Sequence, residues 1–123
     1  KNINPYIVKQ IVNPLGTIKS KGNGGSFQPI IDKAVADKIN NLMVEVVKNG
    51  TGKSSQISGI SVAGKTGSAE NPHGKAHAWF VGFAPAENPQ IAIAVVVENA
   101  GGGGANAGPI ARDVMSQYIN SLK

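Results

Sequence analysis

Residues 65–68 (Lys-Thr-Gly-Ser) place a cation, two hydroxyl groups and a glycine side by side. Together with Gly59 and the glycine just before Lys65, they satisfy the phosphate-binding pattern G-x-x-x-x-G-K-[ST]. That pattern requires a buried strand before its first glycine and a helix after its lysine. Residues 52–56 are too polar for the strand, and Pro72 opposes the helix. The sequence therefore argues against a phosphate site.

The first element around this stretch is a helix, predicted within residues 32–50. Its apolar positions recur at intervals of three and four residues and form one stripe: Val35, Ile39, Leu42, Met43, Val46 and Val47. Asp32 suits the N-cap, and Gly50 suits a left-handed C-terminal cap. Because the other face is polar, we expect the helix to pack its stripe on a flat surface.

Three strands are expected in succession within residues 59–99. They cover residues 61–69, 76–85 and 90–98. The second is rich in β-favouring aromatic residues, and the third contains an uninterrupted apolar run, 91–97, which predicts a strand buried on both faces. Residues 85–89 suit a hairpin between these two strands, so the three form an antiparallel meander.

A second helix is predicted within residues 108–122. Pro109 suits its first position, and large apolar residues follow every four positions: Ile110, Val114, Tyr118 and Leu122. Residues 1–31 are irregular, with short strands expected in residues 6–12 and 17–19 around a turn at 13–16. The whole pattern predicts an α+β fold: a three-stranded antiparallel meander flanked by two helices, with an incomplete sheet.

Composition excludes several classes of function. The 123 residues are 41% hydrophobic and 15% charged, as in one globular domain. Twelve Lys and Arg against seven Asp and Glu give a net charge of +5, but the bases are scattered and do not alternate with aromatic residues, which argues against nucleic-acid binding. The lack of cysteine excludes disulfides and thiolate metal sites. No signal sequence opens the chain, and its longest apolar run is far below the ~20 residues of a membrane span.

A longer series of motifs points to a family. It comprises residues 50–52 (Gly-Thr-Gly), 62–70 (Val-Ala-Gly-Lys-Thr-Gly-Ser-Ala-Glu), 77–85 (His-Ala-Trp-Phe-Val-Gly-Phe-Ala-Pro) and 93–99 (Ile-Ala-Val-Val-Val-Glu-Asn), then a glycine run. In this order the series resembles the C-terminal part of the transpeptidase domain of class B penicillin-binding proteins, in the superfamily that includes serine β-lactamases. The resemblance implies an incomplete portion of the penicillin-binding transpeptidase fold, with the glycine run as a flexible connection to the final helix.

The resemblance also implies roles for the three residues of the K-T-G motif and for the serine that follows it. Lys65 would supply a fixed positive charge, and the hydroxyls of Thr66 and Ser68 would hydrogen-bond a substrate carboxylate. Gly67 would let the substrate backbone lie against the strand. The Ser68 backbone N–H would be one donor of the oxyanion hole; serine here replaces the threonine common in the family. We expect residues 65–70 to form an exposed edge strand, with Lys65 and the Ser68 hydroxyl on one side of it.

Two further motifs of the family are absent from this sequence. No serine is followed by Lys three residues later or by Asn two residues later; the serines are 20, 26, 54, 55, 58, 61, 68, 116 and 121. The chain thus lacks the nucleophile of Ser-x-x-Lys and the Ser-x-Asn that positions the proton donor. Since both precede K-T-G by a long stretch in the family, we expect a truncated part that is inactive alone.

The function implied for the parent protein is a D,D-transpeptidase. It would cross-link peptidoglycan stem peptides ending in D-Ala-D-Ala through a serine acyl-enzyme, bind β-lactams and need no cofactor. It would act at the extracytoplasmic face of the cell membrane, anchored by a segment outside this chain. Two alternatives stay open: a non-catalytic module binding carboxylate-bearing cell-wall peptides, and a fragment of a serine β-lactamase.

Other residues carry weaker signals. His73 and His77 have the spacing of a zinc pair only on a helix, so no metal site is predicted; His77 is expected to pack beside the strand of Lys65. Glu70 has no partner acid or base nearby in sequence and is expected to be structural or superficial. Trp79 and Phe83 share one face of the second strand and are expected in the core.

The last strand, 91–97, is expected to have an unpaired apolar edge. In the family this strand pairs with an N-terminal strand of the domain, which is absent here. An unpaired flat edge is a template for association, either with residues 6–19 of the same chain or with another chain. The sequence favours self-association through strand 91–97.

Overall fold

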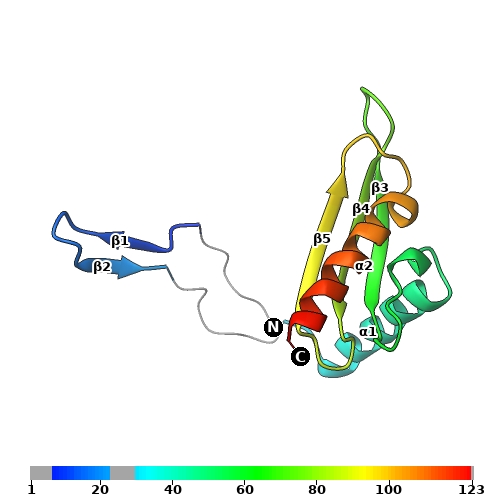
Figure 1. The fold of residues 1–123 in the computed structure, drawn as a ribbon, viewed down its shortest axis with the longest axis horizontal. Coiled ribbons are helices and arrows are strands. Elements are labelled where there is room, and N and C mark those ends of the chain that lie inside the picture. Colours follow the sequence, from blue (N-terminus) through cyan, green and yellow to red (C-terminus); the bar gives the residue numbers. More distant parts are fainter. Residues whose placement is uncertain (1–6, 23–29, 123) are drawn as a thin grey trace. The chain divides into compact units, whose positions relative to one another are not determined.

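The computed structural model describes residues 7–22 and 30–122, and these fall into two compact units, with the division between residues 36 and 37. The first unit contains a small antiparallel hairpin of β1 (Gln10–Val12) and β2 (Ile18–Lys21) (Figure 1). The side-chain oxygen of Asn13 caps its turn, accepting the N–H groups of Leu15 and Thr17 at 3.1 and 2.9 Å. This confirms the predicted turn between short strands, although Tyr6 lies outside the described residues.

Helix α1 (Lys33–Lys48) confirms the first predicted helix. It follows Asp32 directly, whose carbonyl accepts the Ala36 N–H at 3.0 Å. Gly50, however, is not the left-handed cap we expected, since its φ is not positive. It is required for space instead: an added Cβ would lie 2.9 Å from the carbonyl oxygen of Val46.

The apolar stripe of α1 is covered only in part. Val47, near the C-terminal end, is buried, whereas Val35, Ile39 and Leu42 are exposed. The expected packing of the whole stripe on a flat surface is therefore not made by the described residues.

The second unit contains the predicted meander, an antiparallel sheet in the order β3-β4-β5. The strands are β3 (Ala63–Ala69), β4 (His77–Ala84) and β5 (Ile91–Val97). A regular register joins them, from Ala63 opposite Phe83 to Ala69 opposite His77. Both β3 and β5 are edges of this sheet.

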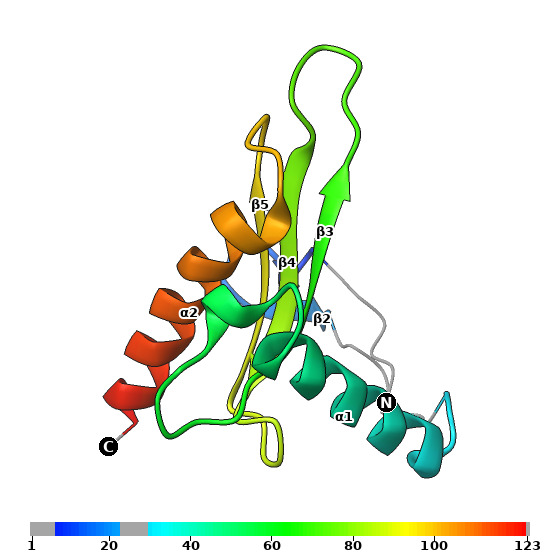
Figure 2. The same cartoon turned by 90° about the vertical axis from the view of Figure 1, so that its right-hand side faces the viewer.

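The core lies between one face of the sheet and helix α2 (Gly103–Ser121), as Figure 2 shows. Alternate residues of β4 point toward α2, among them Ala78 and Phe80, which are fully buried. The Phe80 ring occupies the space over two glycines: a Cβ at Gly64 or Gly82 would lie 2.3 or 2.8 Å from it. Gly64 precedes Lys65, so this packing fixes the start of the K-T-G segment against the core.

The opposite face of the sheet is not covered by α2. Trp79, expected in the core, is 39% exposed, Phe83 on the same face is half-buried, and Val96 is 48% exposed. The predicted burial of β5 on both faces is wrong for the same reason, since its residues alternate between half-buried and exposed. With helix packing on one side only, the second set of alternating side chains faces outward.

Helix α2 begins at Gly103, earlier than the predicted 108, so Pro109 lies inside it rather than at its first position. The first turns of α2 require glycine, because the helix backbone there passes very close to β3, β4 and the loop before β3. A Cβ at Gly103 would lie 2.2 Å from the Trp79 carbonyl oxygen, and one at Gly108 would lie 2.2 Å from the Ser54 hydroxyl. The second half of the glycine run, residues 103–104, is thus a close-packed start of α2, and the first half, residues 101–102, leads into it.

The buried face of α2 is also not the most apolar one. The large residues at four-residue spacing are all exposed: Ile110, Val114, Tyr118 and Leu122. The stripe of α2 that packs on the sheet begins with small residues and continues with larger ones: Ala107, Ala111, Met115 and Ile119. Small side chains allow the close approach that the glycines begin. Within residues 7–22 and 30–122, no helix is long and apolar enough to cross a membrane.

Candidate functional site

The candidate site lies on β3, whose outer side is a free edge in the described sheet. The strand runs without a bulge through Lys65, Thr66, Gly67 and Ser68, and it ends at Ala69, just before the exposed Glu70. A hairpin turn, not a helix, follows it, which is the wrong context for a phosphate-binding loop. The predicted exposed edge strand is therefore confirmed for residues 65–69.

Backbone groups of alternate residues on β3 point toward the free edge. Just before β3, the Ser61 carbonyl accepts the Ala86 N–H at 2.8 Å, so Ser61 turns its carbonyl toward the segment that follows β4. In agreement, the Thr66 carbonyl is reached by the Lys65 ammonium, with Nζ 2.7 Å from the oxygen. Ser68 has the same parity as Thr66, so its N–H and C=O also point outward.

The side chains of Lys65 and Ser68 leave the strand on opposite faces, because the two residues are three apart on a regular strand. The expectation that both lie on one side is therefore wrong at the level of Cβ. Thr66 and Ser68 share the α2 face with their cross-strand partners Phe80 and Ala78. The four-carbon chain of Lys65 nevertheless brings its ammonium back to the edge at Thr66.

The Thr66 side chain has a hydrogen-bond partner that the sequence did not single out. Its Oγ1 lies 2.7 Å from the Oγ1 of Thr51, in the loop between α1 and β3. The next residue, Gly52, is buried and donates its N–H to the Val46 carbonyl at 3.0 Å. Residues 50–52 belong to the family-like motif series, which was the available signal for Thr51.

The short 3-10 turn η1 (Lys53–Ser55) ties this loop to the start of α2. The Ser54 hydroxyl donates to the Gly104 carbonyl, and the Ser55 hydroxyl donates to the Gly52 carbonyl at 2.7 Å. An added Cβ at Gly104 would lie 2.3 Å from the Thr51 carbonyl oxygen. The loop, the first turn of α2 and the middle of β3 thus form one close-packed group.

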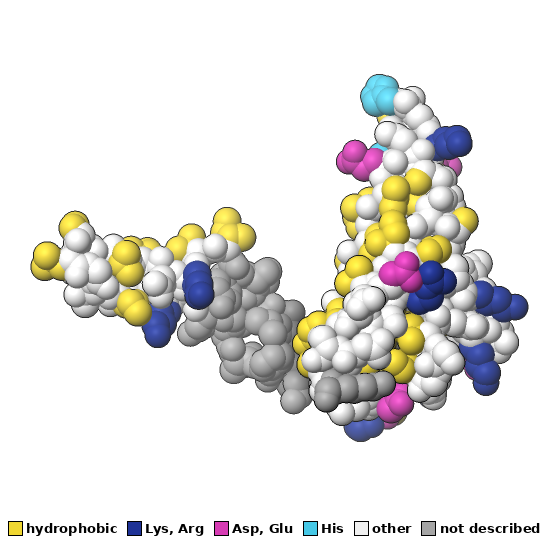
Figure 3. Space-filling view, in the orientation of Figure 1, with side chains coloured by type: hydrophobic (Ala, Val, Ile, Leu, Met, Phe, Trp, Pro, Cys, Tyr) yellow, Lys and Arg dark blue, Asp and Glu magenta, His cyan; other side chains and the backbone are white. Residues whose placement is uncertain are grey.

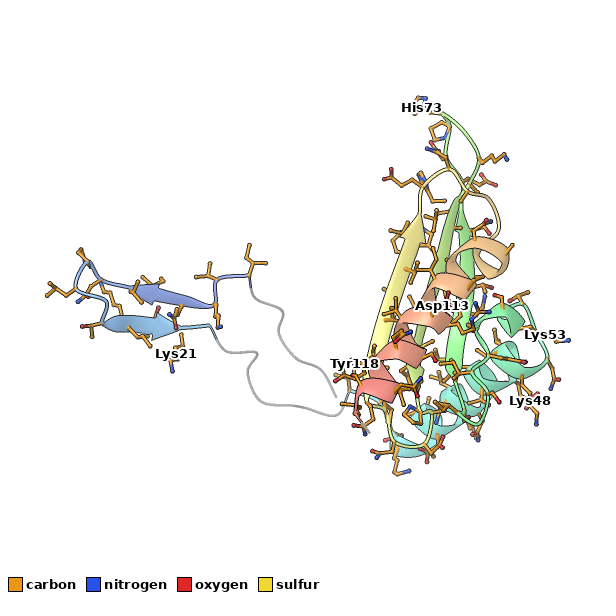
Figure 4. All side chains as sticks on the ribbon, viewed as in Figure 1. Lys21, Lys48, Lys53, His73, Asp113 and Tyr118 are labelled. Carbon is orange, nitrogen blue, oxygen red and sulfur yellow. The ribbon has the colours of Figure 1, made fainter. Side chains whose placement is uncertain are left out.

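The hairpin after Ser68 is anchored through Asn99, which follows β5 in a left-handed conformation with φ 55°. Its side-chain oxygen accepts from the Asn71 amide, and its N–H donates to His77 Nδ1 at 3.1 Å. His77 opens β4 opposite Ala69, beside the strand of Lys65 as predicted. His73 lies at the hairpin tip (Figure 4). The end of β3 is therefore held in a fixed direction.

Charge and cavities do not mark the site further. Figure 3 shows basic side chains over α1 and η1, where Figure 4 places Lys48 and Lys53, while hydrophobic side chains line the β5 side. A cavity of about 240 Å³ lies between α1 and residues 56–62, lined by apolar side chains such as Val44, Val47 and Ile60. This cavity ends before β3, and Lys65 does not line it. The Lys65 side chain is instead exposed on the surface.

Comparison with known proteins agrees with this arrangement. The model of the penicillin binding protein transpeptidase domain matches residues 1–116. The peptidoglycan D,D-transpeptidase PbpA of Mycobacterium tuberculosis is 37% identical over 124 aligned residues, which include 94% of this chain. The peptidoglycan D,D-transpeptidase MrdA of Haemophilus influenzae is 42% identical over 88 residues, which include 58% of this chain and 14% of that protein.

Solved structures show the same fold. Penicillin-binding protein A of M. tuberculosis, in an imipenem acyl-enzyme complex, matches 94% of this chain and 26% of its own with a TM-score of 0.71 and 36% identity. The D,D-transpeptidase domain of a peptidoglycan glycosyltransferase from Eggerthella lenta matches 94% of this chain and 27% of its own, with a TM-score of 0.70 and 32% identity. The chain spans 25% of the length of PbpA. It belongs to the family of penicillin binding protein transpeptidase domains.

Proposed function

We propose that this chain is the K-T-G-bearing part of a peptidoglycan D,D-transpeptidase that acts at the extracytoplasmic face of the cell membrane. Its ligands are stem peptides ending in D-Ala-D-Ala and the β-lactams that mimic them. The observation that carries the proposal is the placement of Lys65 to Ser68 on a free strand edge. An extended peptide can pair with such an edge as a further strand, with neighbouring side chains providing specificity.

The ligand carboxylate is bound by the cation and hydroxyls of this edge. In the structure the Lys65 ammonium donates to a neutral acceptor, the Thr66 carbonyl. A carboxylate is a stronger acceptor for this cation, because its full negative charge adds a Coulomb attraction that a neutral carbonyl lacks. Thr66 and Ser68, whose side chains share one face, add their hydroxyls to the same anion.

The reacting carbonyl lies along the same edge. A serine from another part of the domain attacks it, and the lysine of the same Ser-x-x-Lys motif takes the serine proton. The amide C–N bond then breaks, the terminal D-Ala leaves as an amine that takes up a proton, and the acyl-enzyme ester remains. The negative charge that develops on the carbonyl oxygen is stabilised by the outward-pointing N–H of Ser68. Gly67 has no side chain, so the ligand backbone can lie against the strand between the carboxylate contacts and this N–H.

Lys65→Ala in the complete enzyme should slow acylation by a fluorescent penicillin at least tenfold. A charge-assisted contact is worth roughly 1.5–3 kcal/mol, which corresponds to about 10- to 150-fold. The measurement is the second-order rate of acylation, followed by stopped-flow fluorescence. Lys53→Ala is the matched control, because Lys53 is also exposed but lies on η1. Unchanged kinetics in Lys65→Ala would overturn the role given to this lysine.

We also propose that the isolated chain self-associates through the free edge of β5. Ala84 turns its carbonyl toward the β5 side, where it accepts the Gln90 N–H at 2.9 Å, and its partner in the β4–β5 register is Ile91. Odd-numbered residues of β5 therefore turn toward β4, and Ala94 turns its N–H outward. Unpaired edge groups beside apolar side chains favour pairing with a second copy.

Sedimentation of the isolated chain should therefore show a concentration-dependent dimer. Ala94→Pro should shift it to monomer, because proline removes an outward N–H without breaking a bond to β4. A chain that stays monomeric at every concentration, or a dimer that Ala94→Pro leaves intact, contradicts pairing through this edge.

A further inference from the structure

We infer that Thr51 is a positioning residue for ligand binding, acting through the hydroxyl of Thr66. The two Oγ1 atoms lie 2.7 Å apart, a normal distance for a hydrogen bond between hydroxyls. Thr51 is 15 positions away in sequence and belongs to a different element, the loop after α1. The inference rests on the proposed function, in which Thr66 binds the ligand carboxylate.

The direction of this hydrogen bond is set when a ligand is bound. A hydroxyl has one proton to donate, and a carboxylate can only accept. When Thr66 donates to the ligand carboxylate, its own oxygen can only accept from Thr51. The result is a chain from Thr51 to Thr66 to the carboxylate, in which each hydrogen bond polarises and strengthens the next.

Thr51 is held well enough to act in this way. Its neighbour Gly52 donates to the Val46 carbonyl at 3.0 Å, and a Cβ at Gly52 would lie 3.2 Å from that oxygen. On the other side its carbonyl lies against Gly104, where a Cβ would come within 2.3 Å. The end of α1 and the start of α2 therefore fix the Thr51 backbone, and Figure 2 shows this loop beside both β3 and α2.

The same contacts limit how Thr66 can turn. Its Cγ2 lies 3.7 Å from the Cβ position of Gly104, so its methyl group faces α2 and its hydroxyl faces Thr51. Because the Thr66 side chain is β-branched, it has few χ1 rotamers. The hydrogen bond from Thr51 favours one of these rotamers before the ligand binds. The conformational entropy lost on binding is therefore smaller.

The test is the acylation of the complete enzyme by penicillin, with Thr51→Val and Thr51→Ser compared. Thr51→Val keeps the shape but removes the donor, and it should lower acylation efficiency about three- to tenfold, the worth of one hydrogen bond. The loss should appear mainly as weaker binding before acylation. Thr51→Ser restores the hydroxyl and should recover most of the wild-type rate.

Two further measurements separate positioning from a general structural role. In a double-mutant cycle with Thr66→Val, the Thr51→Val change should have almost no additional effect, because its partner is gone. With a penicillin whose carboxylate is esterified, wild type and Thr51→Val should react alike. Fully additive losses, or equal losses on the ester, overturn the inference. If Lys65→Ala also leaves acylation unchanged, it is the proposed function that fails; if only Thr51→Val does, the failure belongs to this inference alone.

Discussion

The isolated 123-residue chain should acquire no covalent label from a fluorescent penicillin, whereas the complete enzyme should be labelled at its serine. The chain carries the edge of β3 that we propose to bind the carboxylate and the outward N–H of Ser68, but no serine with a lysine three residues later. A site that stabilises charge without supplying a nucleophile cannot form the acyl-enzyme bond. Labelling, followed on a denaturing gel, should therefore be lost entirely rather than reduced.

The hydroxyl groups closest to the proposed ligand are the ones most able to contradict this expectation. Ser68 and Thr66 lie at the proposed ligand edge, but in the part of the chain that the structure describes the side-chain partner of Thr66 is the Thr51 hydroxyl, which is not a base. A hydroxyl at its ordinary pKa is a weak nucleophile without a base to take its proton. Label on the isolated chain that survives denaturation and disappears in Ser68→Ala would show that the nucleophile lies within this sequence.

The elements were predictable from the sequence because their signals are local. Three strands of suitable composition with short turns between them give a meander, and the structure has β3, β4 and β5 within two residues of the expected ends. The edge position of Lys65 was expected from Gly67 and from the need of a substrate to pair with the strand backbone. Regular spacing on a strand and a motif of defined context are both properties that one sequence displays.

The faces of the elements were not predictable in the same way. Helix α2 buries Ala111 and exposes Ile110, because its backbone approaches the sheet at glycines where a larger residue does not fit. Likewise Phe80 is buried and Trp79 is exposed, although both are large and apolar. Hydrophobic spacing shows that a face is apolar; which apolar face meets the helix depends on tertiary contacts that lie far apart in sequence.

The site divides along the same line. Lys65, Thr66, Gly67 and Ser68 carry a motif, whereas the Thr51 contact exists only once the loop after α1 packs on the start of α2. The motif also did not predict where the Lys65 ammonium lies. Strand alternation sends its Cβ to the face opposite that of Ser68, yet its long side chain returns the ammonium to the edge.

The second large effect concerns the backbone of Ser68. Ser68→Pro in the complete enzyme should lower the acylation rate by about a hundredfold or more, since removal of one oxyanion-hole donor costs about 10²–10³ in rate. Proline removes this N–H, which points to the free edge and is not a rung of the β3–β4 ladder. Edge strands tolerate proline at such positions, so the sheet should remain folded.

Ser68→Ala is the matched variant, because it removes the hydroxyl and keeps the N–H. One neutral hydrogen bond to the carboxylate is worth about three- to tenfold, so Ser68→Ala should lose far less activity than Ser68→Pro. Circular dichroism and the melting temperature establish whether the proline variant is folded, and the Kd of a non-covalent inhibitor establishes whether it still binds at this edge. A folded, binding-competent Ser68→Pro that acylates as fast as Ser68→Ala would remove the Ser68 N–H from the mechanism. A folded Ser68→Pro with normal binding and a hundredfold slower acylation would place the effect in the reacting carbonyl rather than in the carboxylate contacts, because only the former gains charge as the bond forms.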